Sequence, residues 1–218
     1  MTTIIGYNTH NQVIFGADMQ RSILDFNGNL KGIESTSVKK IHPLSDKIAI
    51  ASGGIAEPAS SAIDNIKKIL DAKEEYDVST LLEICKDQFS IEYKAFLASK
   101  VGLNHTTLYF LLGGICPTSK KAFMYSFRSD QDFEPNEYPP INVVAMGDGF
   151  YKSETLKLEL ESKPEIFHHN KSYLLNEFSK AIRETAISHE TTGSETYFLV
   201  IKKDNVEERF KNNEGKTI

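Results

Sequence analysis

A chain of 218 residues is long enough to bury a substantial core as one domain, and its 40% hydrophobic and 25% charged residues are typical of soluble globular proteins. The net charge of −5 lacks the basic excess of nucleic-acid-binding proteins, and no apolar run approaches the length of a membrane span. The N-terminus lacks the basic and apolar regions of an export signal, and two cysteines, Cys85 and Cys116, fit a reducing compartment. We therefore expect one cytoplasmic domain over 1–218, with no nucleic-acid or membrane partner.

The first quarter of the chain is predicted to be β-structure, because short apolar and β-branched runs alternate with turn residues. The predicted strands are Thr3–Asn8, Val13–Asp18, Ile23–Phe26, Leu30–Ile33, Ser37–Ile41 and Lys47–Ser52. Asn27-Gly28 predicts a hairpin turn, His42–Asp46 is expected to be a turn, and Gly53-Gly54 ends this block.

The remaining chain alternates helical pairs with strands. Apolar residues at helical spacing predict helices over Glu57–Lys73, from an N-cap at Ser79 through Phe96, over Phe150–Glu161 and over Lys171–Ser188. Further strands are predicted at Thr106–Ile115, Ala122–Phe127, Ile141–Met146, Thr196–Lys202 and Val206–Phe210, with a loop at Arg128–Pro140 and a frayed polar tail at 211–218. Because strands and helices do not alternate singly, we expect an α+β fold with two packed sheets and helix pairs on their outer faces.

Thr2 is the first candidate for chemistry. Met1 precedes a small residue, so its removal is expected, which would leave a free amine on a residue that also carries a hydroxyl. An amine with a pKa of roughly 7.7–8.0 can accept the proton as the hydroxyl attacks a carbonyl. The alternative is that Thr2 and Thr3 are only β-branched residues opening a strand.

Three further features downstream of Thr2 suit acyl transfer. A buried Lys40 ammonium would favour the alkoxide, and Asp18 would hold that ammonium charged and oriented. A backbone N–H of Gly53-Gly54 could stabilise the oxyanion. Each feature alone is typical of a turn or a solvated face, but Lys39 and Lys40 point to opposite sides, so one can point inward.

Four short segments, Thr2–Gly6, Gly16–Asp18, Val38–Ile41 and Ser52–Glu57, resemble in this order the signature segments of a known family. They are similar to those of proteasome β-type subunits and of the bacterial ATP-dependent threonine peptidase, both N-terminal-nucleophile hydrolases. The resemblance covers about residues 2–63 and continues weakly through 145–149 and 198–201.

The resemblance implies a four-layer αββα sandwich and a threonine-type endopeptidase or amidohydrolase that needs no metal or organic cofactor. Thr2 would be the nucleophile, Lys40 its activating neighbour, Asp18 the lysine's partner, and Gly53 the favoured oxyanion donor. Peptide or protein substrates are implied, as are a ring-like homo-oligomer and a regulatory cap or ATPase as partner.

Substrate-binding residues are implied by the same resemblance. Arg21 and Ser22 would line the substrate channel, and Gly54 would lie beside the substrate. Val38, Ala51 and Ile55 would form a side-chain pocket, in which a small Ala51 at the floor leaves room for a large apolar group. The alternative for Ala51 and Ile55 is a place in the core.

The chain departs from the family pattern at three places. The connection from Asp18 to Lys40 is longer and contains the Asn27-Gly28 hairpin, so the rim of the cleft should differ. Asp148 stands where the family has a serine. His189-Glu190-Thr191-Thr192 stands where the family has an Asp-x-x-Ser motif. Thr192 can supply the hydroxyl of that serine, but His189 replaces the carboxylate. We hypothesise that Asp148 restores the lost negative charge.

Other functions remain open. The same fold could support a transpeptidase or ligase, an amidase acting on non-peptide amides, or a non-catalytic ring subunit. His168-His169 lacks the ligand spacing of a zinc site, so no metal is expected there.

Overall fold

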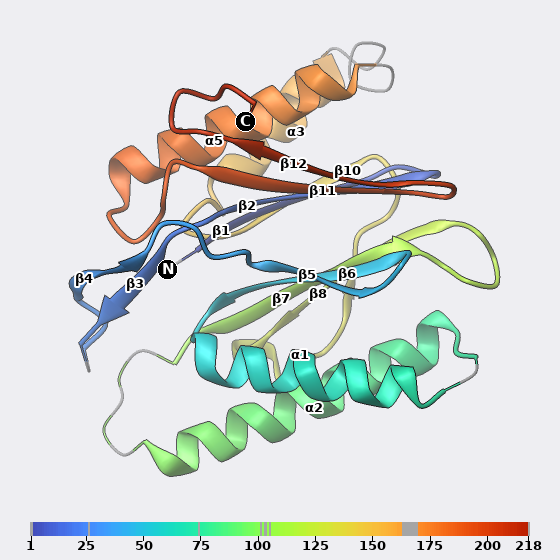
Figure 1. Cartoon of the computed structure of the whole chain (residues 1–218), viewed down its shortest axis with the longest axis horizontal. Coiled ribbons are helices and arrows are strands. Elements are labelled where there is room, and N and C mark those ends of the chain that lie inside the picture. Colours follow the sequence, from blue (N-terminus) through green and yellow to red (C-terminus); the bar gives the residue numbers. More distant parts are fainter. Residues whose placement is uncertain are drawn as a thin grey trace.

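The computed structural model describes residues 2–25, 27–73, 75–100, 102, 104, 106–162 and 170–217. Within these residues the protein is a mixed α+β structure with four α-helices and three antiparallel sheets. Two five-stranded sheets face one another, and helices lie on the outer side of each (Figure 1). The expected α+β class with antiparallel sheets is therefore confirmed.

The first large sheet has the strand order β10-β1-β2-β11-β12. Its strands are β1 (Thr3–Asn8), β2 (Gln12–Asp18), β10 (Asn142–Gly147), β11 (Thr196–Lys202) and β12 (Val206–Lys211). The register pairs Thr3 with Gly147, and Asp18 with Thr196. The N-terminus of the described chain, the end of β2 and the end of β10 consequently meet at one end of this sheet.

The second large sheet has the order β5-β6-β7-β8-β9. Its strands are β5 (Ile41–Ser45), β6 (Ile48–Gly54), β7 (Leu108–Ile115), β8 (Ala122–Arg128) and β9 (Asn136–Glu137). Lys40 directly precedes β5, and Gly53 at the end of β6 pairs with Tyr109 near the start of β7. These residues also lie together, at one end of the second sheet.

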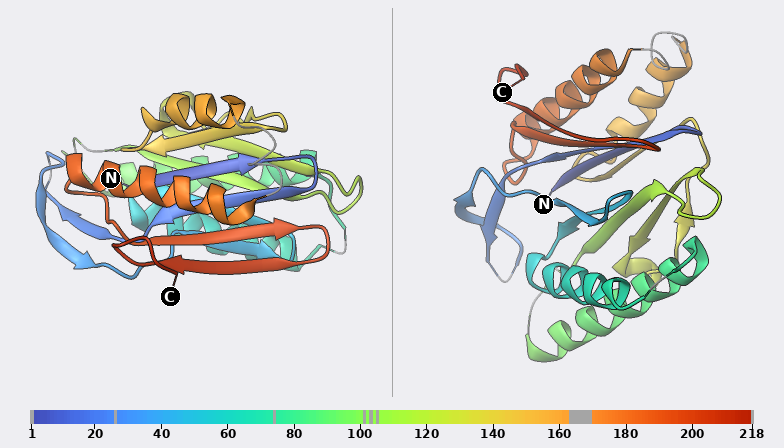
Figure 2. Two further views of the ribbon diagram at one scale, coloured as in Figure 1. Left: turned by 90° about the horizontal axis from the view of Figure 1, so that it is seen from above. Right: turned by 45° about the vertical axis from the view of Figure 1, so that its right-hand side comes forward.

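Alternation along the strands divides the buried side chains among three apolar clusters. On β6, Ile48 and Ile50 pack with helices α1 (Ala56–Asp71) and α2 (Val78–Ser99), whereas Ala49 and Ala51 pack between the two sheets. The third cluster joins the first sheet to α3 (Lys152–Ser162) and α5 (Lys171–Ser188). The views in Figure 2 show the two large sheets and their flanking helices from two other sides.

A separate two-stranded sheet stands beside the large ones (Figure 1). It consists of β3 (Arg21–Leu24) and β4 (Leu30–Ser35), the hairpin predicted from Asn27-Gly28. The turn is stabilised by the Asp25 carboxylate, which accepts the backbone N–H groups of Asn27 and Asn29, and Gly28 adopts φ +86°.

Several predicted boundaries were wrong. Residues 37–40 are not a strand, and β5 instead covers His42–Ser45, where a turn was expected. Pro43 suggested the turn, but β5 is an edge strand, which tolerates proline. Helix α2 is capped by Asp77 rather than Ser79, because the Asp77 carboxylate accepts the Thr80 N–H.

Two segments expected to be irregular contain regular structure. The predicted loop Arg128–Pro140 contains a 3₁₀ turn at Ser129–Gln131 and the short strand β9. In the polar tail, Lys211 belongs to β12, and residues 211 and 217 form an isolated β-bridge around a hydrogen-bonded turn.

Candidate functional site

Asp18 brings the N-terminal strand and Lys40 together. Its Oδ1 accepts the Thr3 N–H at 2.8 Å, and its Oδ2 accepts a hydrogen bond from the Lys40 ammonium at 2.8 Å. The Asp18 side chain is fully buried, and Lys40 is 8% exposed. Thr2 is therefore held, through its neighbour Thr3, on the same carboxylate that binds the buried ammonium.

The Asp18 carboxylate has further hydrogen bonds that fix its position. Its Oδ2 also accepts the backbone N–H of Gln20 at 3.1 Å and that of Gly193 at 3.0 Å. Burial lowers the pKa of Lys40, while Asp18 and, more weakly, Asp148 act in the opposite direction. Lys40 is thus an ammonium that gives up its proton more easily than a solvated lysine and that depends on Asp18 for its charge.

Tyr109, for which no sequence motif predicts a role, contacts Thr2 directly. Its hydroxyl donates to the Thr2 carbonyl oxygen at 2.5 Å, and its oxygen accepts the Thr2 N–H at 3.3 Å. A Cβ on Gly53 would lie 2.4 Å from the Tyr109 ring, and one on Gly147 would lie 2.0 Å from its hydroxyl oxygen. These two glycines make room for the tyrosine beside Thr2.

Asp148 and Thr192 lie on the other side of the N-terminal strand. Asp148 Oδ2 accepts the hydroxyls of Thr191 at 2.7 Å and Thr192 at 3.0 Å, and the Asp148 N–H donates to the Thr2 carbonyl at 3.3 Å. The Thr192 hydroxyl is 3.2 Å from that of Thr3. Both residues therefore belong to the same cluster as Thr2, and the contact that Thr192 makes with the N-terminal strand is to Thr3.

His189 is directed elsewhere. It is the C-cap of α5, and its ring centroid is 6.0 Å from that of Tyr151. The His189 ring therefore packs beside Tyr151 at the end of α5. Met1, on whose removal the free amine depends, lies outside the described residues, as do His168 and His169.

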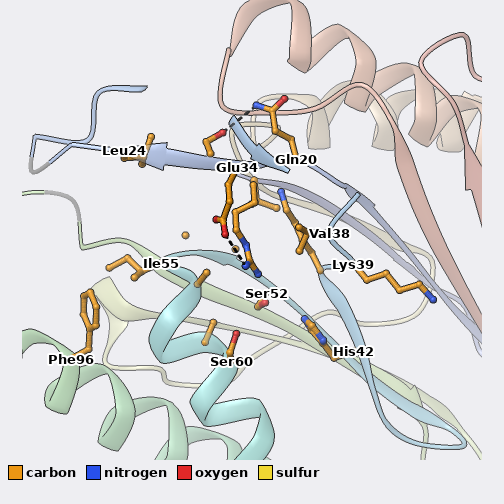
Figure 3. Close-up of a pocket in the computed structure, with 18 of the residues that line it drawn as sticks. Gln20, Leu24, Glu34, Val38, Lys39, His42, Ser52, Ile55, Ser60 and Phe96 are labelled. Atoms are coloured by element: carbon orange, nitrogen blue, oxygen red, sulfur yellow. Dashed lines mark hydrogen bonds and ion pairs between the residues drawn. The ribbon is translucent and has the colours of Figure 1, made fainter. Parts of the chain in front are cut away.

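A pocket of about 290 Å³ opens beside Thr2 (Figure 3). Thr2, Lys40 and the expected residues Arg21, Ser22, Val38, Gly53, Gly54 and Ile55 line it. Side chains that the sequence did not single out complete the wall, among them Leu24, Glu34, His42, Ser52, Ser60 and Phe96. Lys39 points away from the other labelled residues in Figure 3 and pairs with Glu208 at 2.8 Å.

Ala51 does not have the role expected for it. It is fully buried in the cluster between the sheets and is absent from the wall of the pocket. Because side chains alternate along β6, the neighbouring Ser52 lines the pocket instead. Ser52, Ser60 and His42 thus place polar groups in the wall of the pocket, where a small Ala51 was expected at the floor. Burial, followed by the charge of Lys67, lowers the pKa of His42, which favours neutral imidazole.

The pairing of β6 fixes part of the backbone around Gly53 and Gly54, where the oxyanion donor is expected. The Ile55 N–H donates to the Thr107 carbonyl at 3.2 Å. Because hydrogen-bonded and non-hydrogen-bonded pairs alternate along an antiparallel ladder, Gly53, two residues earlier, forms a hydrogen-bonded pair with Tyr109 of β7. The Ser52 N–H points the other way and donates to the Lys40 carbonyl at 2.9 Å. Gly54 adopts φ +93°, so the alternation of β6 is interrupted at this residue, and Gly53 leaves the space that the Tyr109 ring fills.

Among the described residues, no three or more His, Cys, Asp or Glu side chains form a group that could hold a metal ion. No described helix is long and apolar enough to cross a membrane. Comparison of the chain with protein-family models and with curated proteins finds no match.

Proposed function

We propose that this protein is an N-terminal-nucleophile hydrolase of the proteasome β kind, a threonine-type peptidase or amidohydrolase. One observation carries the proposal. The buried Asp18 carboxylate binds both the Thr3 N–H and the Lys40 ammonium, and Thr2 and Lys40 line the same pocket. An ammonium buried near a hydroxyl favours its alkoxide form, and here the two residues that carry these groups line one pocket.

The proposed fold is the four-layer αββα sandwich. The three apolar clusters support it, since one lies between the sheets and the other two lie between a sheet and its helices. This arrangement brings the ends of β2, β6 and β10 to one edge of the molecule, where residues distant in sequence can form one site.

The reaction would begin with loss of Met1. The Thr2 hydroxyl oxygen attacks the substrate carbonyl carbon while its proton passes to the Thr2 amine, and the Lys40 ammonium favours the developing alkoxide. The oxyanion of the tetrahedral intermediate accepts a backbone N–H of Gly53-Gly54, with Gly53 favoured, a contact that can lower the barrier by roughly 2.7–4 kcal/mol.

Collapse of the intermediate breaks the C–N bond. The protonated Thr2 amine gives its proton to the leaving nitrogen, which leaves an ester between the acyl group and Thr2. Water then attacks this ester, giving up a proton to the Thr2 amine. Expulsion of the Thr2 oxygen, which regains that proton, releases the carboxylic acid and restores the enzyme.

The test combines intact-mass measurement with labelling by a peptide vinyl sulfone, which traps a nucleophilic hydroxyl covalently. We expect loss of Met1, labelling of the wild type at Thr2, and no labelling of Thr2→Ala. Thr3→Val is the matched control, because it keeps the N–H bound to Asp18, and it should still be labelled. Retention of Met1 in the protein from its native source, or equal labelling of Thr2→Ala, would falsify the proposal.

Product analysis separates the related reactions. Turnover of a peptide amide in the presence of an added small amine should give the free acid if water resolves the acyl-enzyme. Formation of a new amide as the main product would instead identify a transpeptidase or ligase.

A further inference from the structure

We propose that Tyr109 is a positioning residue of the reaction, whose hydroxyl orients the Thr2 main chain and its amine for proton transfer from the Thr2 hydroxyl. This inference rests on the proposed function. It assigns to an aromatic residue of β7 a role that the motif residues Asp18, Lys40 and Gly53-Gly54 do not perform.

The Tyr109 hydroxyl is both a hydrogen-bond donor and a hydrogen-bond acceptor toward Thr2. The O–H donates to the Thr2 carbonyl at 2.5 Å, so a lone pair of the same oxygen accepts the Thr2 N–H at 3.3 Å. Because one rigid ring supplies both bonds, rotation about the Thr2 backbone is restricted at both ends of the residue. After loss of Met1, one amine hydrogen can remain on the tyrosine while the nitrogen lone pair is free to accept a proton.

The tyrosine is itself held in place by its surroundings. It is 4% exposed and belongs to the cluster between the sheets. The ring occupies the space that side chains on Gly53 and Gly147 would fill, and Gly147 adopts φ +73°. A polar group buried this deeply is normally hydrogen-bonded, and the partner of this one is the candidate nucleophile.

Burial and the neighbouring negative charges keep the Tyr109 hydroxyl protonated. Burial, followed by the negative charges of Asp148 and Asp18, raises the pKa of Tyr109 well above its ordinary value. The group therefore acts as a neutral donor and acceptor across the working pH range. A neutral acceptor stabilises the ammonium form of Thr2 less than a carboxylate would, which favours the neutral amine that the mechanism needs.

The charged groups around this contact are Asp18 on β2, Lys40 before β5 and Asp148 after β10. The two carboxylates favour the protonated amine, and the lysine disfavours it. Removal of the tyrosine oxygen takes an acceptor from the ammonium without changing any of these charges. The pKa of the Thr2 amine should consequently fall when only this oxygen is lost.

The decisive variant is Tyr109→Phe, which keeps the ring that fills the space beside Gly53 and Gly147. The measurement is the rate of Thr2 labelling by the peptide vinyl sulfone as a function of pH. We expect labelling about tenfold slower than in the wild type, because the variant loses both hydrogen bonds that the hydroxyl makes with Thr2. The acid limb of the pH profile should also move to lower pH, which a purely structural role would not produce.

Tyr197→Phe is the matched control. Tyr197 is a buried tyrosine of the same cluster, but its ring lies 4.8 Å below the Lys39 ammonium rather than beside Thr2. Its loss of a hydroxyl should leave the labelling rate and the pH profile unchanged. Replacement of Tyr109 by p-aminophenylalanine keeps a donor and an acceptor at the same place and should restore most of the rate.

The outcomes are distinguishable. Labelling of Tyr109→Phe at the wild-type rate and with the wild-type profile overturns the inference but leaves the proposed function intact. If Tyr109→Phe does not melt cooperatively, the p-aminophenylalanine variant decides, and slow labelling of that folded variant also overturns the inference. Absence of any labelling in the wild type overturns the proposed function and this inference together.

Discussion

Asp18 and Lys40 form a buried ion pair of 2.8 Å that joins the two large sheets. Asp18 ends β2 in the first sheet, and Lys40 immediately precedes β5 in the second. Their contact spans the interface between the sheets at the edge where Thr2 lies. The same bond thus contributes to stability and, in the proposed mechanism, to activation of the nucleophile.

Disruption of this pair should destabilise the protein. Asp18→Asn leaves the buried Lys40 ammonium without a counter-charge, so we expect the free energy of unfolding to fall by about 3–5 kcal/mol. Lys40→Met should cost less, because Asp18 keeps the N–H groups of Thr3, Gln20 and Gly193. Urea denaturation at neutral pH measures both.

The control for this pair is Lys39→Ala. Lys39 and Glu208 also lie 2.8 Å apart, but their side chains are 48% and 46% exposed. Loss of this exposed pair should change the free energy of unfolding by no more than about 1 kcal/mol. Equal effects of Lys39→Ala and Asp18→Asn would contradict the importance assigned to burial.

Activity and stability should respond to alkaline pH in opposite directions. The native pKa of Lys40 is lower than its unfolded value of about 10.5, chiefly because of burial. Between these two values the unfolded chain binds more protons than the native one, so the contribution of Lys40 to stability rises with pH. Labelling of Thr2 should fall over the same window, because the ammonium is lost.

Two titrations test this opposition. Urea denaturation of the wild type and Lys40→Met across the alkaline range isolates the lysine's contribution, and the labelling rate is measured in the same buffers. A stability difference between the two proteins that does not change with pH would show that the native pKa of Lys40 is not lowered.

Asp148 is expected to contribute to the reaction. Asp148→Ala removes the acceptor of the Thr191 and Thr192 hydroxyls and a negative charge that favours the Lys40 ammonium. We expect Thr2 labelling to slow about tenfold or more, with a smaller effect for Asp148→Ser, which keeps a hydroxyl. Asp130→Ala, at an exposed carboxylate paired with Arg128, is the control. Wild-type rates in both Asp148 variants would end the hypothesis that Asp148 supplies the missing charge.

Gly147 should not tolerate a side chain. A Cβ there would lie 1.8 Å from the Thr2 carbonyl oxygen, and the residue adopts φ +73°. We expect Gly147→Ala to lower the free energy of unfolding by about 1–3 kcal/mol or more and to slow labelling. At Gly32 no heavy atom lies within 4 Å, so Gly32→Ala should be neutral or stabilising by about 0.4–1 kcal/mol. Thermal denaturation compares the two, and an equal response of both variants would contradict the steric argument.

The regular elements of this fold could largely be predicted from the sequence. The predicted strands Thr3–Asn8 and Thr196–Lys202 and the helix Lys171–Ser188 have the observed bounds. Their apolar patterns are long and uninterrupted, so the period is unambiguous. The failure at β5 has a local cause, since proline usually marks a turn and only the place of β5 at the sheet edge explains its presence in a strand.

The site could be predicted only in part. Asp18 and Lys40 were selected through the order of short motifs, and the structure brings them into contact. Ala51 was misassigned, although strand alternation with Ile48 and Ile50 already placed Ser52, not Ala51, on the helix-facing side of β6. Tyr109 could not have been found, because an aromatic residue in a fully buried strand is indistinguishable from core until Thr2 is seen beside it.

The hairpin β3–β4 has a consequence for how this protein could change its substrate. It supplies Arg21, Ser22, Leu24 and Glu34 to the pocket, yet it is hydrogen-bonded to neither large sheet in the strand order. Thr2, Asp18 and Lys40 are anchored instead to the sheets themselves. Exchange of residues 21–35 should therefore alter this part of the pocket wall while the Asp18–Lys40 pair stays in place, and His42, Ser52, Ile55 and Phe96 should keep the rest of the wall unchanged.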